Sequence, residues 1–315
     1  MPPVRPVEQA DPRGPAPAVA VDGIPGAGVI GGRPFASTAP AATGPVIHIR
    51  PTAGWWDFRL GEVWACRELL WFLVWKDVKV RYKETLIGAA WAVLQPVFTM
   101  VVFTIFFGRI AKLPSTGLPY PVFYMAALLP WTYFAGALSN CTNAIVENQR
   151  IITKVYFPRL LLPISAVISG IVDLAIAIVV MVPLLIYYLI TPTAGLLLLP
   201  VFVLMATLAA LAVGLWLTTL NAMYRDVRYV MPFMIQLFMF ASPVIYSVSS
   251  VPERWQWLYG LNPMVGVIEG FRWAITGAGR PPGMVMIPSF VAVCVCLLFG
   301  LMFFSRVDGS LADRI

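Results

Sequence analysis

Long apolar runs, separated by short polar stretches, occupy most of the chain after residue 85. The hydrocarbon core of a bilayer is about 30 Å thick, and a helix of about 20 apolar residues can cross it. Six runs reach that length, so the pattern predicts an all-α integral membrane protein with six transmembrane helices. The predicted spans are 86–108, 122–146, 162–190, 195–221, 230–249 and 285–305.

The segment before the first predicted span has a different pattern. It reads RELLWFLVWKDVKVRYKE (67–84), and its apolar run Leu69–Trp75 is too short to cross a bilayer. On a helix, aromatic and branched residues fall on one stripe and lysines on another. The two stripes are Trp71, Val74, Val78 and Tyr82, and Lys76, Lys79 and Lys83. This pattern predicts an N-terminal amphipathic helix in the cytoplasmic interface of the membrane.

A broken apolar stretch lies between the fifth and sixth predicted spans. It reads RWQWLYGLNPMVGVIEGFRWAITGAG (254–279), and glycines, Asn262-Pro263 and Arg272 interrupt it. Broken backbone at membrane depth is tolerated only against protein or water. We therefore expect two short re-entrant helices that enter and leave the outer, periplasmic leaflet.

The first 52 residues are rich in Pro, Ala and Gly, and this composition predicts a disordered cytoplasmic tail. A G-x-G-x-x-G match, Gly26–Gly31, is flanked by Pro25 and Pro34 rather than by a strand and a helix, so it does not indicate a dinucleotide site. Residues 53–315 are expected to form one transmembrane domain.

Charge defines the orientation of that domain. Only 12% of the residues are charged, against about a quarter in soluble proteins, and the net charge is +7. Lys and Arg concentrate before the first span, after the second and fourth spans, and at the C-terminus. The positive-inside rule then places both termini in the cytoplasm, and the basic residues indicate topology rather than nucleic-acid binding.

Few residues offer catalytic or metal chemistry. His48 is the only histidine, and Cys294 and Cys296 would point to opposite sides of a helix. No metal site or bound cofactor is therefore expected in this chain. The only carboxylate near the middle of a predicted span is Asp173. A lone charge there costs about 2.5–3.5 kcal/mol, so Asp173 is expected to face the bundle interior and to have a partner.

The chain also lacks a source of energy. It has no G-x-x-x-x-G-K-[ST] motif, and no relay of carboxylates accompanies Asp173. The segment NQRIITKVYFPRLLLP (148–163) combines basic and apolar residues on the cytoplasmic side. An apolar patch rimmed by charge marks a contact site. From the residues alone, this segment either docks a separate protein or folds onto the membrane surface or the first amphipathic helix.

Residues 55–315 resemble the membrane subunit of type-2 ABC exporters of polysaccharides, a family that includes O-antigen, capsule and teichoic-acid permeases. Four long stretches carry the resemblance in the expected order. They are RYKETLIGAAWAVLQPVFTMVVFTIFFG (81–108), NQRIITKVYFPRLLLP (148–163), NAMYRDVRYVMPFMIQLFMFASPVIYSVSSVPERW (221–255) and LNPMVGVIEGFRWAI (261–275).

The resemblance implies a permease without its own ATPase activity, located in the bacterial inner membrane. Two copies of this chain would assemble with two ABC ATPase subunits, which bind ATP and Mg. The cargo would be a polyprenyl-diphosphate-linked glycan. The segment near 150–160 would be the coupling helix that inserts into the ATPase. Its expected contact residues are Arg150, Lys154, Val155, Tyr156, Phe157 and Pro158.

A conduit for a sugar polymer needs aromatic faces for stacking and few deep polar traps. In related exporters, spans 1 and 5 line the channel. The candidates for the substrate path are Trp91, Gln95, Phe98, Phe106, Phe233, Phe240 and Tyr246, with Gln236 nearby.

Two further groups of residues have expected roles. Arg81, Lys83 and Arg225 would attract the lipid diphosphate, because arginine forks match phosphate geometry. The broken segment 256–277 would form a periplasmic gate, with Asn262, Pro263, Glu269 and Arg272 as its key residues. Glu269 and Arg272 are three apart, so they can form an ion pair on one helix.

Other classes remain alternatives. A membrane-embedded enzyme of glycan assembly would need acid–base or metal-binding residues around one site, and no Asp-x-Asp motif occurs. An ion-coupled carrier would depend on Asp173. A narrow channel would show a polar filter ring, and none is evident in the sequence.

Overall fold

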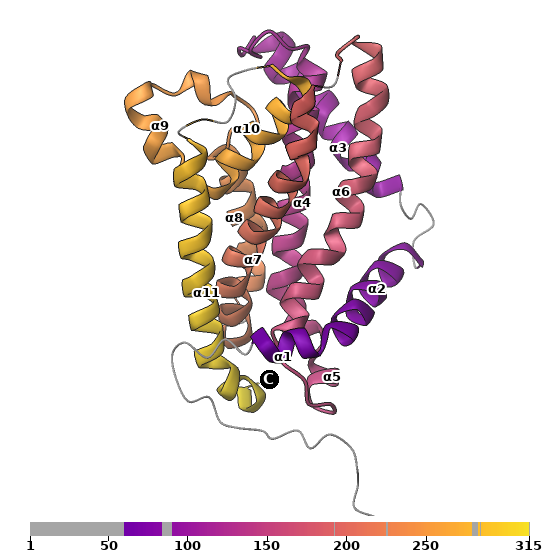
Figure 1. Cartoon of the computed structure of the whole chain (residues 1–315), viewed down its shortest axis with the longest axis vertical. Coiled ribbons are helices and arrows are strands. Elements are labelled where there is room, and N and C mark those ends of the chain that lie inside the picture. The colour runs from indigo at the N-terminus through magenta and orange to yellow at the C-terminus, as the bar shows by residue number, and fades with distance from the viewer. Residues whose placement is uncertain are drawn as a thin grey trace, which may run out of the picture. The chain divides into compact units, whose positions relative to one another are not determined.

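The computed structural model describes residues 60–83, 90–191, 193–224, 226–278, 283 and 285–314 of the chain (Figure 1). The predicted tail, 1–52, lies outside these residues. Within them every regular element is a helix. The α-helices are α1 (Leu60–Ala65), α2 (Arg67–Lys83), α3 (Ala90–Phe103), α4 (Tyr120–Glu147), α5 (Gln149–Ile152), α6 (Leu161–Tyr187), α7 (Leu199–Met223), α8 (Val227–Phe240), α9 (Glu253–Tyr259), α10 (Pro263–Thr276) and α11 (Met286–Arg314). A π-helix, η1 (Thr104–Ile110), continues α3, and two 3₁₀ turns, η2 (Ala194–Leu198) and η3 (Val248–Ser250), precede α7 and α9.

Five helical stretches in the described part of the chain are long and apolar enough to cross a membrane. They are Ala90–Ile110, Tyr120–Glu147, Leu161–Tyr187, Ala194–Met223 and Met286–Asp308. These stretches confirm five of the six predicted spans, with shifts of a few residues at their ends. The chain is therefore a membrane protein whose described part is all-helical.

The predicted fifth span, 230–249, does not form one long helix. The helix α8 has 14 residues and ends at Phe240, so it is about 21 Å long, shorter than a hydrocarbon core. Pro243 explains this end, because it has no N–H to donate and its ring disfavours the helical conformation at Ser242. The prediction of a continuous span here was wrong, and the six-span count is not confirmed.

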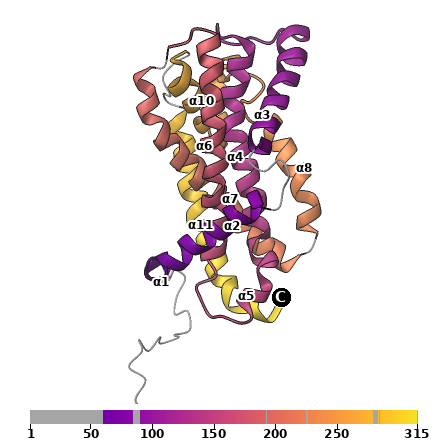
Figure 2. The same cartoon turned by 90° about the vertical axis from the view of Figure 1, so that its right-hand side faces the viewer.

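The helix α4 forms the centre of the bundle and contacts α3, α6, α7, α8 and α10 (Figures 1 and 2). In its most apolar window 78% of the residues are buried, against 17% for the stretch Ala90–Ile110. Small residues allow this close packing. A side chain at Gly214 would meet Cys141 Sγ, and one at Gly170 would meet the Tyr133 ring. The outer helices expose apolar side chains, as expected for surfaces that face lipid or another subunit.

The helix α2 is inclined against the bundle and packs on α6 (Figures 1 and 2). Leu73, Val74 and Val78 are buried, whereas Trp71 is 69% exposed. The predicted stripe that grouped Trp71 with Val74 and Val78 was therefore only partly right. The buried face is rotated towards Leu73 and Asp77, because polar side chains of α2 bond to the bundle on that side.

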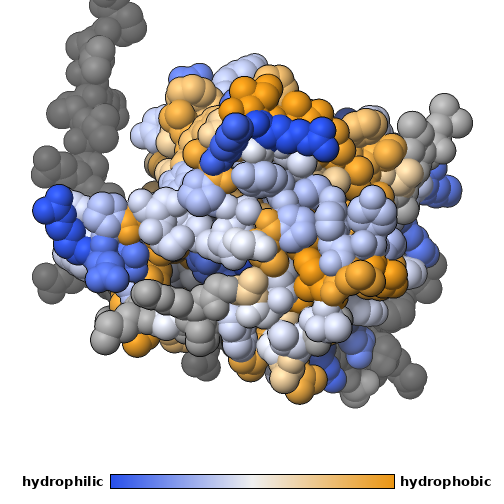
Figure 3. Space-filling model, turned by 90° about the horizontal axis from the view of Figure 1, so that it is seen from above, coloured by the Kyte–Doolittle hydropathy of each residue, from blue (hydrophilic) through white to orange (hydrophobic). Residues whose placement is uncertain are grey.

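The two ends of the bundle differ. Figure 1 shows α1, α5 and the C-terminus at one end, and α9 and α10 at the other. The segments that sequence reasoning placed on one side of the membrane therefore lie at one end of the bundle. The pair α9 and α10 matches the two short helices predicted for 254–279. Figure 3 looks onto the α9–α10 end and shows hydrophobic residues reaching the surface between polar ones.

Candidate functional site

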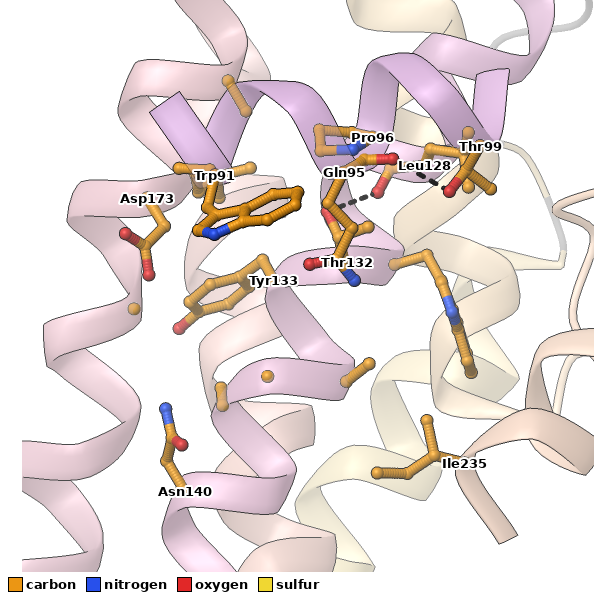
Figure 4. Close-up of a pocket in the computed structure, with 18 of the residues that line it drawn as sticks. Trp91, Gln95, Pro96, Thr99, Leu128, Thr132, Tyr133, Asn140, Asp173 and Ile235 are labelled. Atoms are coloured by element: carbon orange, nitrogen blue, oxygen red, sulfur yellow. Dashed lines mark hydrogen bonds between the residues drawn. The ribbon is translucent and has the colours of Figure 1, made fainter. Parts of the chain in front are cut away.

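A cavity of about 610 Å³ lies between α3, α4, α6 and α8, beside the C-terminal end of α2 (Figure 4). Aromatic side chains form much of its wall, and amide and hydroxyl groups are spread among them. The aromatic residues are Trp91, Phe103, Trp131, Tyr82 and Tyr133, and the amide and hydroxyl residues are Gln95, Thr99, Thr132, Asn140 and Gln236.

The residues predicted to line a substrate path divide into two sets. Trp91 and Gln95 line the cavity, and so does Gln236, but the other candidates do not line it. Those others are Phe98, Phe106, Phe233, Phe240 and Tyr246. The cavity face of α3 runs in steps of four residues through Trp91, Gln95, Thr99 and Phe103, and Phe98 lies outside this row. Phe98, Phe106, Phe233 and Phe240 are all exposed on the outside of the chain.

Sequence reasoning missed the contribution of α4 to the cavity. Thr132, Gly136 and Asn140 line it, and Tyr133 donates a hydrogen bond to Val167 O at 3.3 Å. The signal was present, because a Thr, a Gly and an Asn recur at four-residue spacing in an otherwise apolar span. Polar residues on one face of a span indicate a polar partner or a water-filled space.

Asp173 has the partner that the sequence required. Its carboxylate forms an ion pair with Arg81 and accepts a hydrogen bond from the Tyr82 hydroxyl. The second guanidinium nitrogen of Arg81 lies 3.5 Å from Ser169 Oγ. Burial and the bond to Asp173 raise the pKa of Tyr82 above its usual range, so Tyr82 keeps its proton and remains a donor.

This pair changes the expectation for the three basic residues assigned to the lipid diphosphate. Arg81 lines the cavity but already binds Asp173, and Lys83 is exposed at the end of α2. Arg225 lies outside the described residues. The structure therefore places an arginine at the cavity wall with an anion of the protein already bound to it.

Further polar contacts attach α2 to the end of the bundle that carries α5. Lys76 Nζ donates to Asn148 Oδ1 at 3.0 Å, just before α5. Ser165 Oγ lies 3.5 Å from Asp77 Oδ2, near the start of α6. The amphipathic helix is thus joined to the segment that was expected to contact another protein.

The segment 148–163 contains the short helix α5, a turn, and the first residues of α6. Arg150 and Lys154 are exposed, and Val155 and Tyr156 are each 56% exposed. Phe157 is different, because it is only 8% exposed and packs in a cluster with Leu161 and Phe304. Five predicted contact residues are thus at least partly accessible, including Pro158, whereas Phe157 anchors the segment.

Arg159 attaches the same segment to the last helix. It donates to the backbone carbonyl of Asp308 and lies 3.4 Å from the Asp308 carboxylate. Together with Lys76 and Asn148, this contact links the exposed segment to α2 on one side and to α11 on the other.

At the opposite end, Asn262 and Pro263 begin α10. Asn262 Oδ1 accepts from Met264 N at 2.9 Å, and Pro263 occupies a first-turn position where its missing N–H costs nothing. Asn262 Nδ2 also donates to Ala241 O at 3.1 Å. These predicted gate residues therefore cap α10 and attach it to the end of α8.

The predicted ion pair between Glu269 and Arg272 is present, at 2.9 Å. Arg272 is 3% exposed and donates to the carbonyls of Pro243 at 2.7 Å and Val244 at 3.1 Å. Its guanidinium also lies 3.8 Å from the centre of the Phe123 ring, a cation–π contact. These two carbonyls lie in the turn that follows the end of α8, so Arg272 attaches α10 to that turn.

Comparisons with known proteins agree with this architecture. The family model for ABC-2 type transporters matches residues 68–276. The chain is 30% identical over 242 residues to the O-antigen export system permease protein RfbA of Myxococcus xanthus, covering 76% of this chain and 91% of that protein. It is 26% identical over 239 residues to the protein of that name from Klebsiella pneumoniae, with coverages of 76% and 91%. The polysialic acid transport protein KpsM of Escherichia coli is 24% identical over 235 residues, with coverages of 72% and 88%.

Proposed function

The chain belongs to the ABC-2 type transporter family, and from that premise we propose that it is the channel-forming subunit of an ATP-driven exporter of a lipid-linked polysaccharide. The exporter acts in the bacterial inner membrane, and two copies of this chain assemble with two copies of an ABC ATPase. The observation that carries the proposal is the cavity lined by aromatic rings and amides, in a permease related to O-antigen and polysialic acid transport proteins.

The cavity fits a sugar chain by its chemistry. Trp91 and Tyr133 offer ring faces for the C–H surfaces of sugars, and Gln95, Asn140 and Gln236 offer donors and acceptors for hydroxyls. These amides carry no charge, so each contact with a sliding polymer is weak. Such a lining favours movement of a glycan over its retention.

The exposed aromatic residues outside the cavity support a path shared by two subunits. Phe98 is 61% exposed and Phe233 is 60% exposed, on α3 and α8. A second copy placed against these helices would enclose Phe98 and Phe233 together with the open side of the cavity. In this arrangement the exposed aromatic residues and the cavity-lining residues would line the same substrate path.

The exposed segment 148–163 supports docking of the ATPase. Val155 and Tyr156 project beside Arg150 and Lys154, and Phe157 fixes the segment to the bundle. This part of the chain and both termini are assigned to the cytoplasm, and α9 and α10 to the periplasmic side as the gate. ATP and Mg belong to the partner subunit, and this chain binds no cofactor of its own.

Reconstitution tests the proposal directly. The full-length chain is co-expressed with the ATP-binding subunit of its own gene cluster and inserted into liposomes with a labelled polyprenyl-diphosphate-linked glycan. We expect ATP-dependent transfer of the glycan, and none when the partner lacks its Walker-A lysine. Transfer without the partner, driven by an ion gradient, would instead support the carrier alternative, and chain growth without transfer would support an assembly enzyme.

A further inference from the structure

The wall of the cavity contains one pair of opposite charges. Among its described lining residues, Arg81 is the only basic one and Asp173 the only carboxylate. Their side chains are 31% and 29% exposed, so the pair remains accessible from the cavity. An ion pair with this exposure contributes little to stability, in contrast to a fully buried one.

The carboxylate of Asp173 is bound in the way a protein binds a small anion. One oxygen pairs with the Arg81 guanidinium, and the other accepts from the Tyr82 hydroxyl. Both donors stand in the last turn of α2, where the helix dipole also favours a basic side chain. A guanidinium fork with an adjacent hydroxyl suits a phosphate at least as well as a carboxylate.

We propose that Arg81 and Tyr82 form a phosphate site whose resident anion is Asp173, and that a phosphate or diphosphate ester on the cargo displaces Asp173 from it. This inference rests on the proposed function for its cargo. A diphosphate carries more negative charge than one carboxylate, so the exchange favours the incoming group. The displacement breaks the contact between the last turn of α2 and α6.

The structure also gives a route by which α2 passes this change on. Lys76 lies five residues before Arg81 on the same helix, about 8 Å along its axis, and it bonds to Asn148 at the start of the exposed segment. Release of one end of α2 therefore reaches the surface assigned to the ATPase. Binding of a cargo phosphate at Arg81 is in this way transmitted to the surface that docks the ATPase.

Two substitutions with opposite expected effects test the exchange. The full-length chain is placed in phosphatidylcholine nanodiscs, and binding of farnesyl diphosphate is measured by calorimetry. Asp173→Asn removes the competing anion, so affinity should rise about tenfold, and Arg81→Gln removes the fork, so affinity should fall about tenfold. Arg81→Lys keeps the charge but not the fork, so its affinity for farnesyl diphosphate should lie between those of the wild type and Arg81→Gln.

A matched control is available on the same helix. Asp77→Asn removes the other carboxylate that links α2 to α6, and Asp77 does not line the cavity. It should loosen α2 without raising the affinity for farnesyl diphosphate. The exchange would be overturned if the affinity changed equally in Asp77→Asn and Asp173→Asn. It would also be overturned if the affinity changed in the same direction in Asp173→Asn and Arg81→Gln, because the pair would then have only a structural role.

The source of the phosphate is decided by competing probes. Inorganic pyrophosphate tests a free anion, and phosphatidylglycerol in the nanodisc tests a common lipid headgroup. Displacement of farnesyl diphosphate by either probe would assign the site to that source, and displacement by neither would assign it to the cargo. Absence of any diphosphate binding by the wild type would overturn the site, while ATP-dependent export in liposomes would still support the proposed function.

Hydrogen exchange reports the release itself. Farnesyl diphosphate should increase amide exchange in the last turn of α2 in the wild type, because local opening exposes its backbone. Exchange there should already be raised in Asp173→Asn and should not respond to the probe in Arg81→Gln. Binding without any change in α2 exchange would overturn the proposed link to the helix.

Discussion

Two of the arginine–carboxylate pairs in the described part of the chain differ sharply in their surroundings, one at the cavity and one within α10. Arg272 and Glu269 are three residues apart, and Arg272 is 3% exposed with backbone carbonyls as further acceptors. Arg81 and Asp173 are 92 residues apart and both remain partly exposed. The comparison teaches that burial and the number of acceptors, rather than the ion pair itself, decide whether an arginine is fixed or available for exchange.

The largest loss of folding stability is expected for substitution of the buried Arg272. Arg272→Ala leaves the carbonyls of Pro243 and Val244 without their donor, removes one of the two donors to Glu269, and opens a space beside Phe123. A buried acceptor left without a donor costs about 1–3 kcal/mol, so the two carbonyls alone should make the loss about 2–6 kcal/mol. The unfolding midpoint in detergent should fall sharply, and ion leak through reconstituted protein should rise.

Arg272→Lys is the matched control for charge. One ammonium cannot reproduce the planar fork that reaches two carbonyls and stacks on a ring, so it should restore little of the lost stability. A lysine variant as stable as the wild type would mean that charge alone matters at this position. The contrast between the two arginines would then be weaker than the geometry indicates.

A second contrast of the same kind concerns neighbouring residues of the exposed segment. Phe157→Asp puts a charge at a site that is 8% exposed and should cost about 3 kcal/mol of folding stability. Tyr156→Asp changes a side chain that is 56% exposed, so stability should change by less than about 0.5 kcal/mol. Thermal unfolding measures both variants.

Tyr156→Asp should nevertheless impair function. If this residue contacts the ATPase, the variant should remain folded while ATP-dependent export falls and the partner no longer co-purifies at the wild-type ratio. Normal export by Tyr156→Asp would contradict the assignment of segment 148–163 to ATPase docking. Loss of export in Phe157→Asp would not test that assignment, because this variant also loses an anchor.

A smaller effect on stability is expected at the accessible pair. Arg81→Gln should lower the free energy of unfolding by only about 0–1 kcal/mol, because both partners are partly solvated. The variant should still bind farnesyl diphosphate about tenfold more weakly than the wild type. A loss of stability as large as that of Arg272→Ala would remove the physical difference between the two pairs.

Salt gives the smallest and most selective effect. Raising ionic strength from about 0.1 M to about 1 M shortens the Debye length from about 10 Å to about 3 Å. The stability difference between wild type and Arg81→Gln should shrink, whereas the difference between wild type and Arg272→Ala should stay nearly constant. Chemical denaturation at two concentrations of sodium chloride provides the measurement, and equal sensitivity of both differences would argue against the contrast.

The sequence by itself determined the features that depend on residues close in the chain. Apolar length predicted six spans, five of which are long helices, and a three-residue spacing predicted the pair Glu269–Arg272. Asn262-Pro263 predicted a break, which is the start of α10. Each of these follows from the rise and the period of a single helix, so no knowledge of its neighbours is needed.

Only the tertiary structure decided how the helices face one another. It turned Trp71 of α2 outwards and brought Arg81 to Asp173. It also divided the predicted path residues between the cavity and the outer surface. The physical reason is that a helical pattern fixes which residues share a face, whereas the rotation of that face depends on packing against segments far away in the chain.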